Sequence, residues 1–331
     1  MVKIDSKLWI KRYGRVRNKI FDALEGSLVE KKVPDNVMAA CMQNFHRGKC
    51  IRGIISFMIY MMTNHSNTPL KDKIRDAVIV GAVPEALHIA SLIHDDVVDR
   101  SETRRGDPTV YYKYGDNIAA VAGDVWMFAP ILSDLYAIPH PHHLLDIDHE
   151  MRTAGFTMSV GEMKDSLETD TGEGERSGVE EYLKIIGEKT LPLIRASATV
   201  PATANGASEI QKEAIREYSN NVGYAFQIRD DVIDIVGSEK EAMKDLRKNI
   251  DIGSNYVLSL YHDEFGDLRK RDVELLKAGK ISQRMVYCVS ETQANINEFI
   301  CDAIKCLHIF EHDKHKKGLV DTAIFCGTRE R

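Results

Sequence analysis

The 331-residue sequence is poor in aromatic residues and proline, and its cysteines follow no spacing typical of a metal site. Aromatic residues make up 7% of the chain, which also holds nine prolines and six cysteines. Four of the cysteines are scattered over the last fifth of the chain. We therefore expect reduced thiols in a cytoplasmic protein.

The sequence also lacks features that would place it in other classes of protein. Its formal net charge of −6 argues against a nucleic-acid-binding surface. No uninterrupted apolar run approaches the ~18–20 residues that cross a bilayer, and the N-terminal segment has no apolar signal-peptide core. We expect neither a nucleic-acid partner nor a membrane-spanning segment.

What is present is a globular composition with apolar residues at helical spacing. The chain is 44% apolar and 28% charged, and it is long enough to bury a sizeable core. Helical spacing is clearest over residues 51–65, 83–99, 179–200 and 210–237. Turn-rich breaks fall at 64–70, 137–150, 168–178 and 203–208. Strand-like alternation is nearly absent, so the sequence predicts one all-α domain over residues 1–331, a large helical bundle.

Two acidic motifs of the form DDxxD lie 135 residues apart, each inside an apolar run. The carboxylates are those of Asp95, Asp96, Asp99, Asp230, Asp231 and Asp234. Residues i and i+4 project from the same face of a helix, so the first and last aspartates of each motif point together. Such carboxylates suit Mg²⁺, which often takes its remaining ligands from water and a substrate phosphate.

The alternative for each motif is an acidic helix face bathed in water, which is what most charge clusters are. It explains one motif alone better than both together, because both are flanked by apolar residues and not by polar ones. Two acidic walls in apolar surroundings favour a metal site, and two facing walls would line one cavity around a diphosphate.

Basic residues alternate with the acidic motifs along the chain. The candidates are Lys49, Arg52, Arg104, Arg105, Lys189 and Lys248. Adjacent arginines offer planar forks suited to phosphate oxygens. Each basic pair taken singly is more often a solvated surface feature, but their order between the acidic motifs indicates a diphosphate site.

At this point the chain resembles the trans-isoprenyl diphosphate synthases, or polyprenyl synthetases, from about residue 44 to about residue 260. The matching segments are GKCIR (48–52), LHIASLIHDDVVDRSETRRGDPT (87–109), VAGD (121–124), GE (161–162), EKT (188–190) and GYAFQIRDDVID (223–234). HDDVVDRSETRRG is most similar to the longer-chain members.

The resemblance implies a bundle of mostly antiparallel helices around a deep central cavity. Members of this family condense isopentenyl diphosphate head to tail with an allylic diphosphate, need Mg²⁺, and are generally homodimers. By this analogy Asp95 and Asp99 hold two Mg²⁺ ions and Asp230 holds a third. The expected contacts to the allylic diphosphate are Arg104, Lys189 and, less securely, Lys248.

The resemblance also implies a second diphosphate site and a pair of residues beside the reacting carbon. The diphosphate of isopentenyl diphosphate would be held by Lys49, Arg52, His88 and Arg105. Thr190 and Gln227 would lie beside the developing allylic cation.

Residues on the helix before the first acidic motif bear on product length in this family. Ala90 and Ser91 are small, and Leu87, one turn earlier, is not aromatic. We therefore expect an open tunnel and a product of C20 or longer, in the range C25–C40. Ordinary packing with no influence on length is the alternative, and large residues at 57–62 are candidates for the tunnel floor.

The match is uneven, and other functions stay open. The basic motif, usually GGKRxRP, reads RGKCIRG here, with Cys50 and Gly53 substituted. The alternatives are a short-chain (geranylgeranyl or farnesyl) diphosphate synthase, a terpene cyclase, a non-catalytic partner subunit and a plain helical scaffold. A second diphosphate site argues against the cyclase, and two complete acidic motifs argue against the partner subunit.

Overall fold

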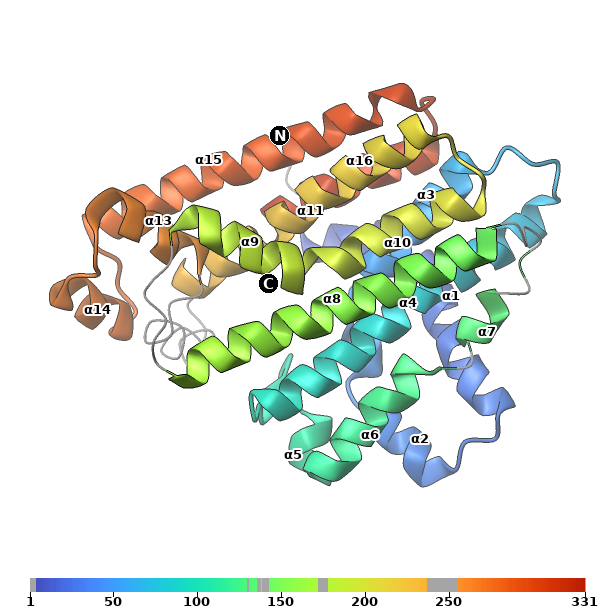
Figure 1. Ribbon diagram of the computed structural model, residues 1–331, viewed down its shortest axis with the longest axis horizontal. Coiled ribbons are helices and arrows are strands. Elements are labelled where there is room, and N and C mark those ends of the chain that lie inside the picture. Colours follow the sequence, from blue (N-terminus) through green and yellow to red (C-terminus); the bar gives the residue numbers. More distant parts are fainter. Residues whose placement is uncertain are drawn as a thin grey trace.

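Helices make up nearly all of the computed structural model, which describes residues 4–129, 131–135, 138, 143–171, 178–236 and 255–330 (Figure 1). The first half contains α1 (Ser6–Glu30), α2 (Asp35–Cys41), η1 (Phe45–Arg47), α3 (Ile51–Thr63), α4 (Leu70–Val98), β1 (Thr103–Arg104), β2 (Asp107–Pro108), α5 (Val110–Tyr114), α6 (Asp116–Met127) and α7 (Ile131–Leu135). The second half contains α8 (Leu144–Thr171), α9 (Val179–Lys189), α10 (Leu191–Ala204), α11 (Glu209–Val236), α13 (Tyr256–Phe265), α14 (Lys270–Lys277), α15 (Gln283–Cys306), η3 (Leu307–Ile309) and α16 (Lys314–Thr328). The all-α prediction is confirmed.

The expected helices are present, with two differences. The segment predicted as one helix over 179–200 is two helices, α9 and α10, which meet at Thr190. Pro192 explains the break, because its ring lacks an N–H and would clash with a carbonyl one turn earlier. The break expected at 137–150 is shorter than predicted, because α8 already begins at Leu144.

Helix α4 lies in the middle of the bundle, where it contacts α1, α3, α6, α7 and α10. By length and composition alone, α4 and the segment Asp116–Leu135 could cross a membrane. Two such helices are weak evidence for a membrane span, because a helix buried in the core passes the same test. More than half of the apolar window of α4 is buried inside the bundle, so its hydropathy follows from its central position.

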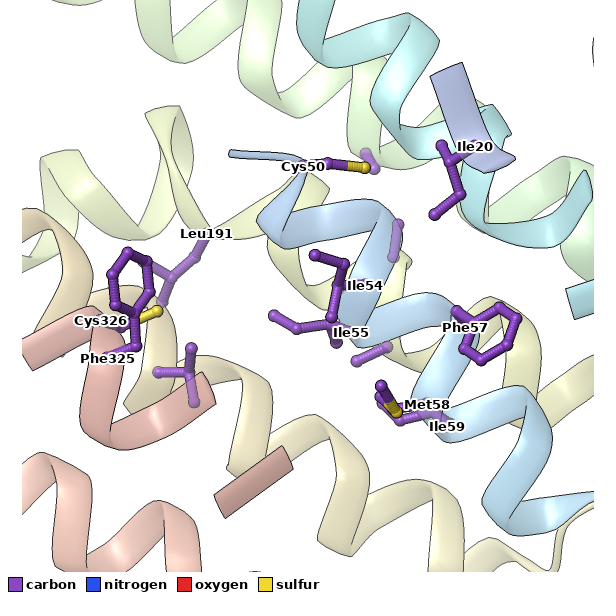
Figure 2. Packing of buried hydrophobic residues seen from close by; sticks show 14 of the residues in the cluster. Ile20, Cys50, Ile54, Ile55, Phe57, Met58, Ile59, Leu191, Phe325 and Cys326 are labelled. Atoms are coloured by element: carbon purple, nitrogen blue, oxygen red, sulfur yellow. The ribbon is translucent and has the colours of Figure 1, made fainter. Parts of the chain in front are cut away.

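The two ends of the chain are joined through α1 and α16. The rings of Trp9 and Phe325 stack with centroids 4.5 Å apart. Arg12 Nη1 and the Tyr13 hydroxyl each donate to Asp321 Oδ2 at 2.7 Å. Figure 2 shows Phe325 on α16 and Ile55 on α3 among the buried side chains around α3. This packing fixes the end of α16 next to the start of α3.

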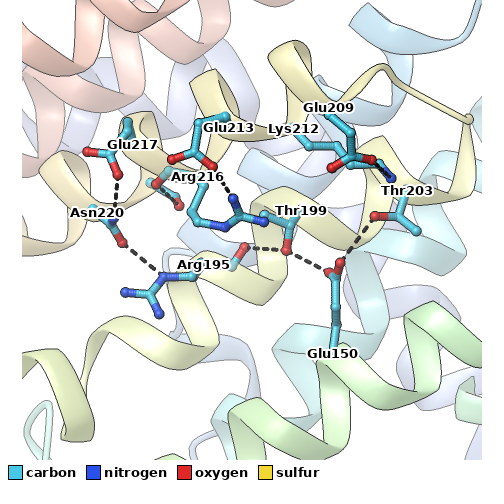
Figure 3. Close-up of polar contacts among 11 residues, drawn as sticks. Glu150, Arg195, Thr199, Thr203, Glu209, Lys212, Glu213, Arg216, Glu217 and Asn220 are labelled. Carbon is cyan, nitrogen blue, oxygen red and sulfur yellow. Dashed lines mark hydrogen bonds and ion pairs between the residues drawn. The ribbon is translucent and has the colours of Figure 1, made fainter.

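Polar contacts tie α10 to its neighbours α8 and α11 (Figure 3). The carboxylate of Glu150 on α8 accepts hydrogen bonds from Thr199 (2.7 Å) and Thr203 (3.2 Å) on α10. Arg195 Nε on α10 donates to Asn220 Oδ1 on α11 at 3.0 Å. These bonds fix the register of the helices that carry much of the candidate site.

Candidate active site

A cavity of about 1900 Å³ opens among α3, α4, α8, the α9–α10 junction and α11. Most of the residues singled out from the sequence line it: Lys49, Arg52, Leu87, His88, Ser91, Asp95, Asp96, Asp99, Arg104, Arg105, Lys189, Thr190, Gln227, Asp230 and Asp234. The fold thus brings together segments that lie up to 185 residues apart in the sequence. Lys248 lies outside the described residues.

The first acidic motif ends α4, where Asp99 is the C-cap residue. A two-stranded hairpin then turns the chain back, with Thr103 opposite Pro108 and Arg104 opposite Asp107. This return places Nε and Nη2 of Arg104 each 2.8 Å from Asp96 Oδ1. The carboxylate of Asp96 is therefore paired with Arg104. Asp95, Asp96 and Asp99 all line the cavity.

Glu162 on α8 adds a carboxylate that the sequence analysis gave no role. Its oxygens lie 3.0 and 3.2 Å from Lys189 Nζ, at the end of α9. Burial and the nearby Glu162 raise the pKa of Asp95 to about 7, although Lys189 and Arg104 oppose the shift. Asp95 is therefore less readily ionised than an ordinary aspartate. In the sequence, the GE pair at 161–162 was the feature that could have identified Glu162 as a residue of the site.

The second acidic motif divides its carboxylates between two environments. Asp230 and Asp234 line the cavity, and Asp230 forms an ion pair with Arg329. Asp231 is 4% exposed and does not line the cavity. Its Oδ2 accepts from the Tyr182 hydroxyl at 2.5 Å and from the Tyr256 N–H at 2.7 Å. Burial raises its pKa to about 7. Asp231 is therefore buried and bonded to two donors of the protein, which corrects its assignment as a metal ligand.

Arg329 is the cavity residue that the sequence gave no means of finding. Its side chain is 7% exposed, and its guanidinium lies 4.0 Å from the ring centroid of Phe226. The backbone carbonyl of Arg329 accepts from Arg229 Nε at 2.9 Å. Helix α16 brings it to a carboxylate 99 residues earlier, a contact that only the tertiary structure could reveal.

The other candidate diphosphate site lies at the start of α3 and one face of α4. Arg52 Nε is buried and, among the described residues, has no hydrogen-bond partner. Burial, Arg329 and Arg105 lower the pKa of Lys49 to about 8, against the effect of Asp230. Burial, with Arg52 and Arg105, holds the pKa of His88 well below its ordinary value, so the ring is neutral. Among the described residues, the main opposing charge on both Arg52 and Arg105 is a single carboxylate, that of Glu85.

Glu85, one turn before His88, is the buried counter-charge of this cluster, and no motif in the sequence marks it. It is 2% exposed, and its Oε2 accepts from the Gly53 N–H at 3.2 Å. Burial raises its pKa, while Arg52 and Arg105 act in the opposite direction. The Cys50 thiol supplies no charge here, because burial raises its pKa well above the ordinary value.

The two residues expected beside the reacting carbon are hydrogen-bonded to each other. Thr190 Oγ1 donates to Gln227 Oε1 at 3.4 Å, and both line the cavity. Thr190 stands at the break between α9 and α10, next to Lys189. The two side chains that were expected beside the reacting carbon are therefore neighbours in the cavity wall.

The residues expected to influence product length fall into two groups, those that line the cavity and those that do not. Leu87 and Ser91 line the cavity, whereas Ala90 is 1% exposed and does not. The large residues at 57–62 do not line it either; Phe57, Met58 and Ile59 pack among the core side chains around α3 (Figure 2). Ala90 and the 57–62 stretch are therefore corrected as length determinants, because α4 and α3 turn these side chains into the core.

The carboxylates suit a divalent cation shared with a phosphate better than a metal held by protein alone. Among the described residues, no three His, Cys, Asp or Glu side chains converge on a metal site. Carboxylates that do not converge fit Mg²⁺, which retains waters and binds substrate phosphate. Arg329 at Asp230 and Lys189 at Glu162 are cations already placed against these carboxylates.

Comparison with known proteins gives consistent matches. The model of the polyprenyl synthetase family matches residues 34–271. A short chain isoprenyl diphosphate synthase from Methanocaldococcus jannaschii is 31% identical over 236 residues, 70% of this chain and 68% of the relative. A geranylfarnesyl diphosphate synthase from Aeropyrum pernix is 32% identical over 233 residues, 69% of this chain and 70% of the relative. The fold is shared with the crystal structure of a geranylgeranyl pyrophosphate synthetase from Pyrococcus horikoshii, at 24% identity and a TM-score of 0.79, over 98% of this chain and 99% of that one.

Proposed function

Because the chain belongs to the polyprenyl synthetase family, we propose that it is a trans-prenyltransferase that condenses isopentenyl diphosphate head to tail with an allylic diphosphate. The product is a polyprenyl diphosphate of C20 or longer. The observation that carries the proposal is the joint lining of one cavity by both acidic motifs and two groups of cations.

The allylic diphosphate is assigned to the acidic end of the cavity. Asp95, Asp99 and Asp230 would hold Mg²⁺ ions, three per site, against its oxygens. The bound metal supplies positive charge that stabilises the diphosphate as it departs. Lys189 and Arg104 lie at the same end and add fixed cationic donors, which need no reorganisation during the reaction.

Isopentenyl diphosphate is assigned to the cluster at the start of α3. Arg52 and Lys49 supply charge, Arg105 a planar fork, and neutral His88 a ring nitrogen that donates without adding repulsion. Arg52 Nε has no hydrogen-bond partner in the described part of the chain, which supports this assignment, since a phosphate oxygen would satisfy it. The two sites open on the same cavity, so the double bond of one substrate is held close to the reacting carbon of the other.

The chemistry between the sites requires charge stabilisation and exclusion of water. As the C–O bond of the allylic diphosphate breaks, Thr190 and Gln227 oxygens lie beside the developing carbocation. The double bond of isopentenyl diphosphate attacks it, and the proton lost in the final step goes to the released diphosphate. Apolar cavity walls such as Leu87 and Phe226 keep water from capturing the cation.

A second copy of this chain is proposed as partner. Helices α6 and α8 expose large apolar side chains: Ile118, Val121, Phe128, Phe156, Met163 and Leu167. Phe128 and Phe156 also line the cavity, so the two exposed faces both reach it. Exposed apolar surface of this extent is typical of an interface. Light scattering during gel filtration distinguishes a dimer from a monomer.

A cytoplasmic location also belongs to the proposal. All six cysteines are free thiols in the structure, as in a reducing compartment.

The function is tested by incubating purified protein with isopentenyl diphosphate, farnesyl diphosphate and Mg²⁺, followed by mass spectrometry of the dephosphorylated products. A Mg²⁺-dependent ladder reaching C20 or longer, absent with EDTA, supports the proposal. A ladder ending at C15 from shorter primers would identify a short-chain synthase. A cyclised hydrocarbon would indicate a cyclase, and no turnover of any primer by folded protein would reject the synthase.

A further inference from the structure

The cavity changes character along helix α8. One face of α8 lines it from Glu162 through Ser159 and Gly155 to Arg152 and Asp148. Glu162 belongs to the end that holds the acidic motifs, through its contact with Lys189. Arg152 and Asp148 lie ten and fourteen residues earlier, roughly 15 and 21 Å along the helix axis. The part of α8 that lines the cavity thus has charged residues at both ends, with uncharged residues between them.

The middle of this path suits a hydrocarbon chain. Ser159 and Gly155 leave space, and a Cβ added at Gly155 would meet no atom within 4 Å. Leu87, Met127, Met151 and Met158 line the cavity together with this face. Each isoprene unit placed against these walls is removed from water, which favours its addition.

The far end of the path does not suit a hydrocarbon chain. Arg152 Nε and Asp148 Oδ2 form an ion pair at 2.7 Å. The Arg152 side chain is 78% exposed, so the cavity reaches the protein surface here. A chain that grew against this pair would strip water from two charges without offering them a hydrogen bond. It would therefore gain nothing from further apolar contact.

We propose that the Asp148–Arg152 ion pair ends the apolar path of the cavity and thereby limits product length. The inference rests on the proposed synthase function and adds a length determinant on α8 to Ser91 and Leu87 on α4, which line the same cavity. Both charged residues act on the growing chain and not on the diphosphates, so the rate of the first condensation should not depend on them.

The test compares the product ladder of the wild type with that of Asp148→Leu/Arg152→Leu. We expect the most abundant product to lengthen by at least one C5 unit, with unchanged KM for isopentenyl diphosphate. Asp146→Leu is the matched control, because Asp146 lies at the same end of α8 but does not line the cavity. An unchanged ladder in the double variant, or equal lengthening in the control, overturns the proposal. Failure of the wild type to elongate any primer would instead reject the synthase function itself.

A second pair of variants covers the case in which the double variant does not fold. Gly155→Glu moves a charge one turn closer to the acidic motifs, and Gly155→Met adds a side chain of similar size without charge. We expect Glu to shorten the main product by at least one C5 unit relative to Met. Equal product lengths would show that bulk, and not charge, ends the path, and would overturn the proposal.

Discussion

The hydroxyl of Tyr182 donates a 2.5 Å hydrogen bond to Oδ2 of Asp231, the middle carboxylate of the second acidic motif. Both side chains are buried, Tyr182 to 1% and Asp231 to 4% exposure. Since the same oxygen also accepts from the Tyr256 N–H, this carboxylate joins α9 and the start of α13 to α11. In this DDxxD motif, Asp231 is therefore positioned to hold the helix while Asp230 and Asp234 face the cavity.

Tyr182→Phe should lower the free energy of unfolding and leave Mg²⁺ dependence nearly unchanged. The buried carboxylate loses one donor, which costs about 1–3 kcal/mol. Urea denaturation and the Mg²⁺ concentration for half-maximal activity are the measurements. Tyr112→Phe, at a tyrosine that is 60% exposed, is the control. A large rise in the Mg²⁺ requirement of folded Tyr182→Phe would instead place Asp231 among the metal ligands.

Binding of isopentenyl diphosphate should weaken as the pH rises through about 8. The folded-state pKa of Lys49 is about 8, below its ordinary value, so above that pH the free protein carries neutral Lys49. Binding of an anion then requires protonation of the amine, at a cost of up to about tenfold in Kd for each further pH unit. In the absence of ligand, a rise in pH has the opposite effect on folding stability, which it increases. The unfolded chain binds more protons between the folded and unfolded pKa values, so the contribution of Lys49 to stability rises with pH there.

Calorimetric titrations of isopentenyl diphosphate from pH 7 to pH 9.5 measure this dependence. Lys49→Arg is the control, since its guanidinium stays charged over the whole range. The difference between the two pH profiles isolates Lys49 from titration of the ligand. Parallel profiles would contradict a role for this amine in binding.

Ser91→Phe should shorten the product. Ser91 lines the cavity one turn before Asp95, and its hydroxyl donates to the His88 carbonyl at 2.9 Å. A phenyl ring at this position projects into the path of the growing chain, so the longest product should lose at least one C5 unit. Mass spectrometry of the prenols is the measurement, with Ser91→Ala as the small control. A ladder as long as that of the wild type would place the growing chain elsewhere.

Glu85→Gln should raise the KM for isopentenyl diphosphate on the order of tenfold, or about 1.4 kcal/mol. The amide oxygen can still accept from Gly53, but the charge that holds Arg52 and Arg105 is lost. The KM for the allylic diphosphate should stay within about twofold, because Glu85 lies in the cluster at the start of α3 and not at the acidic end of the cavity. Equal changes in both constants would point to a general loss of structure.

Gly53→Ala should destabilise the fold by about 1–3 kcal/mol. A Cβ at Gly53 would lie 2.9 Å from the carbonyl oxygen of Gly81, where α3 crosses α4. Gly26→Ala in α1 is the matched control: its Cβ meets nothing within 4 Å, and the change should be neutral or stabilising by up to about 1 kcal/mol. Similar denaturation midpoints for the two variants would show that the crossing relaxes easily.

The sequence by itself determined the all-α class, both acidic motifs and most of the charged residues of the candidate site that line the cavity. Helical periodicity fixes which side chains of one helix point together, so Asp95 and Asp99 could be paired without coordinates. The spacing of the basic residues likewise marked Lys49, Arg52 and Arg104.

Only the tertiary structure decided which face of each helix meets the cavity. Periodicity tells which side chains of a helix point in the same direction. Whether that direction is toward the cavity or the core depends on how the helix packs against its neighbours. This is why Ser91 lines the cavity while Ala90, the adjacent residue, is buried in the core. It is also why Asp231 faces Tyr182, and why Arg329, 99 residues further along the chain, pairs with Asp230. Such contacts depend on how helices distant in the sequence pack, and no local pattern encodes them.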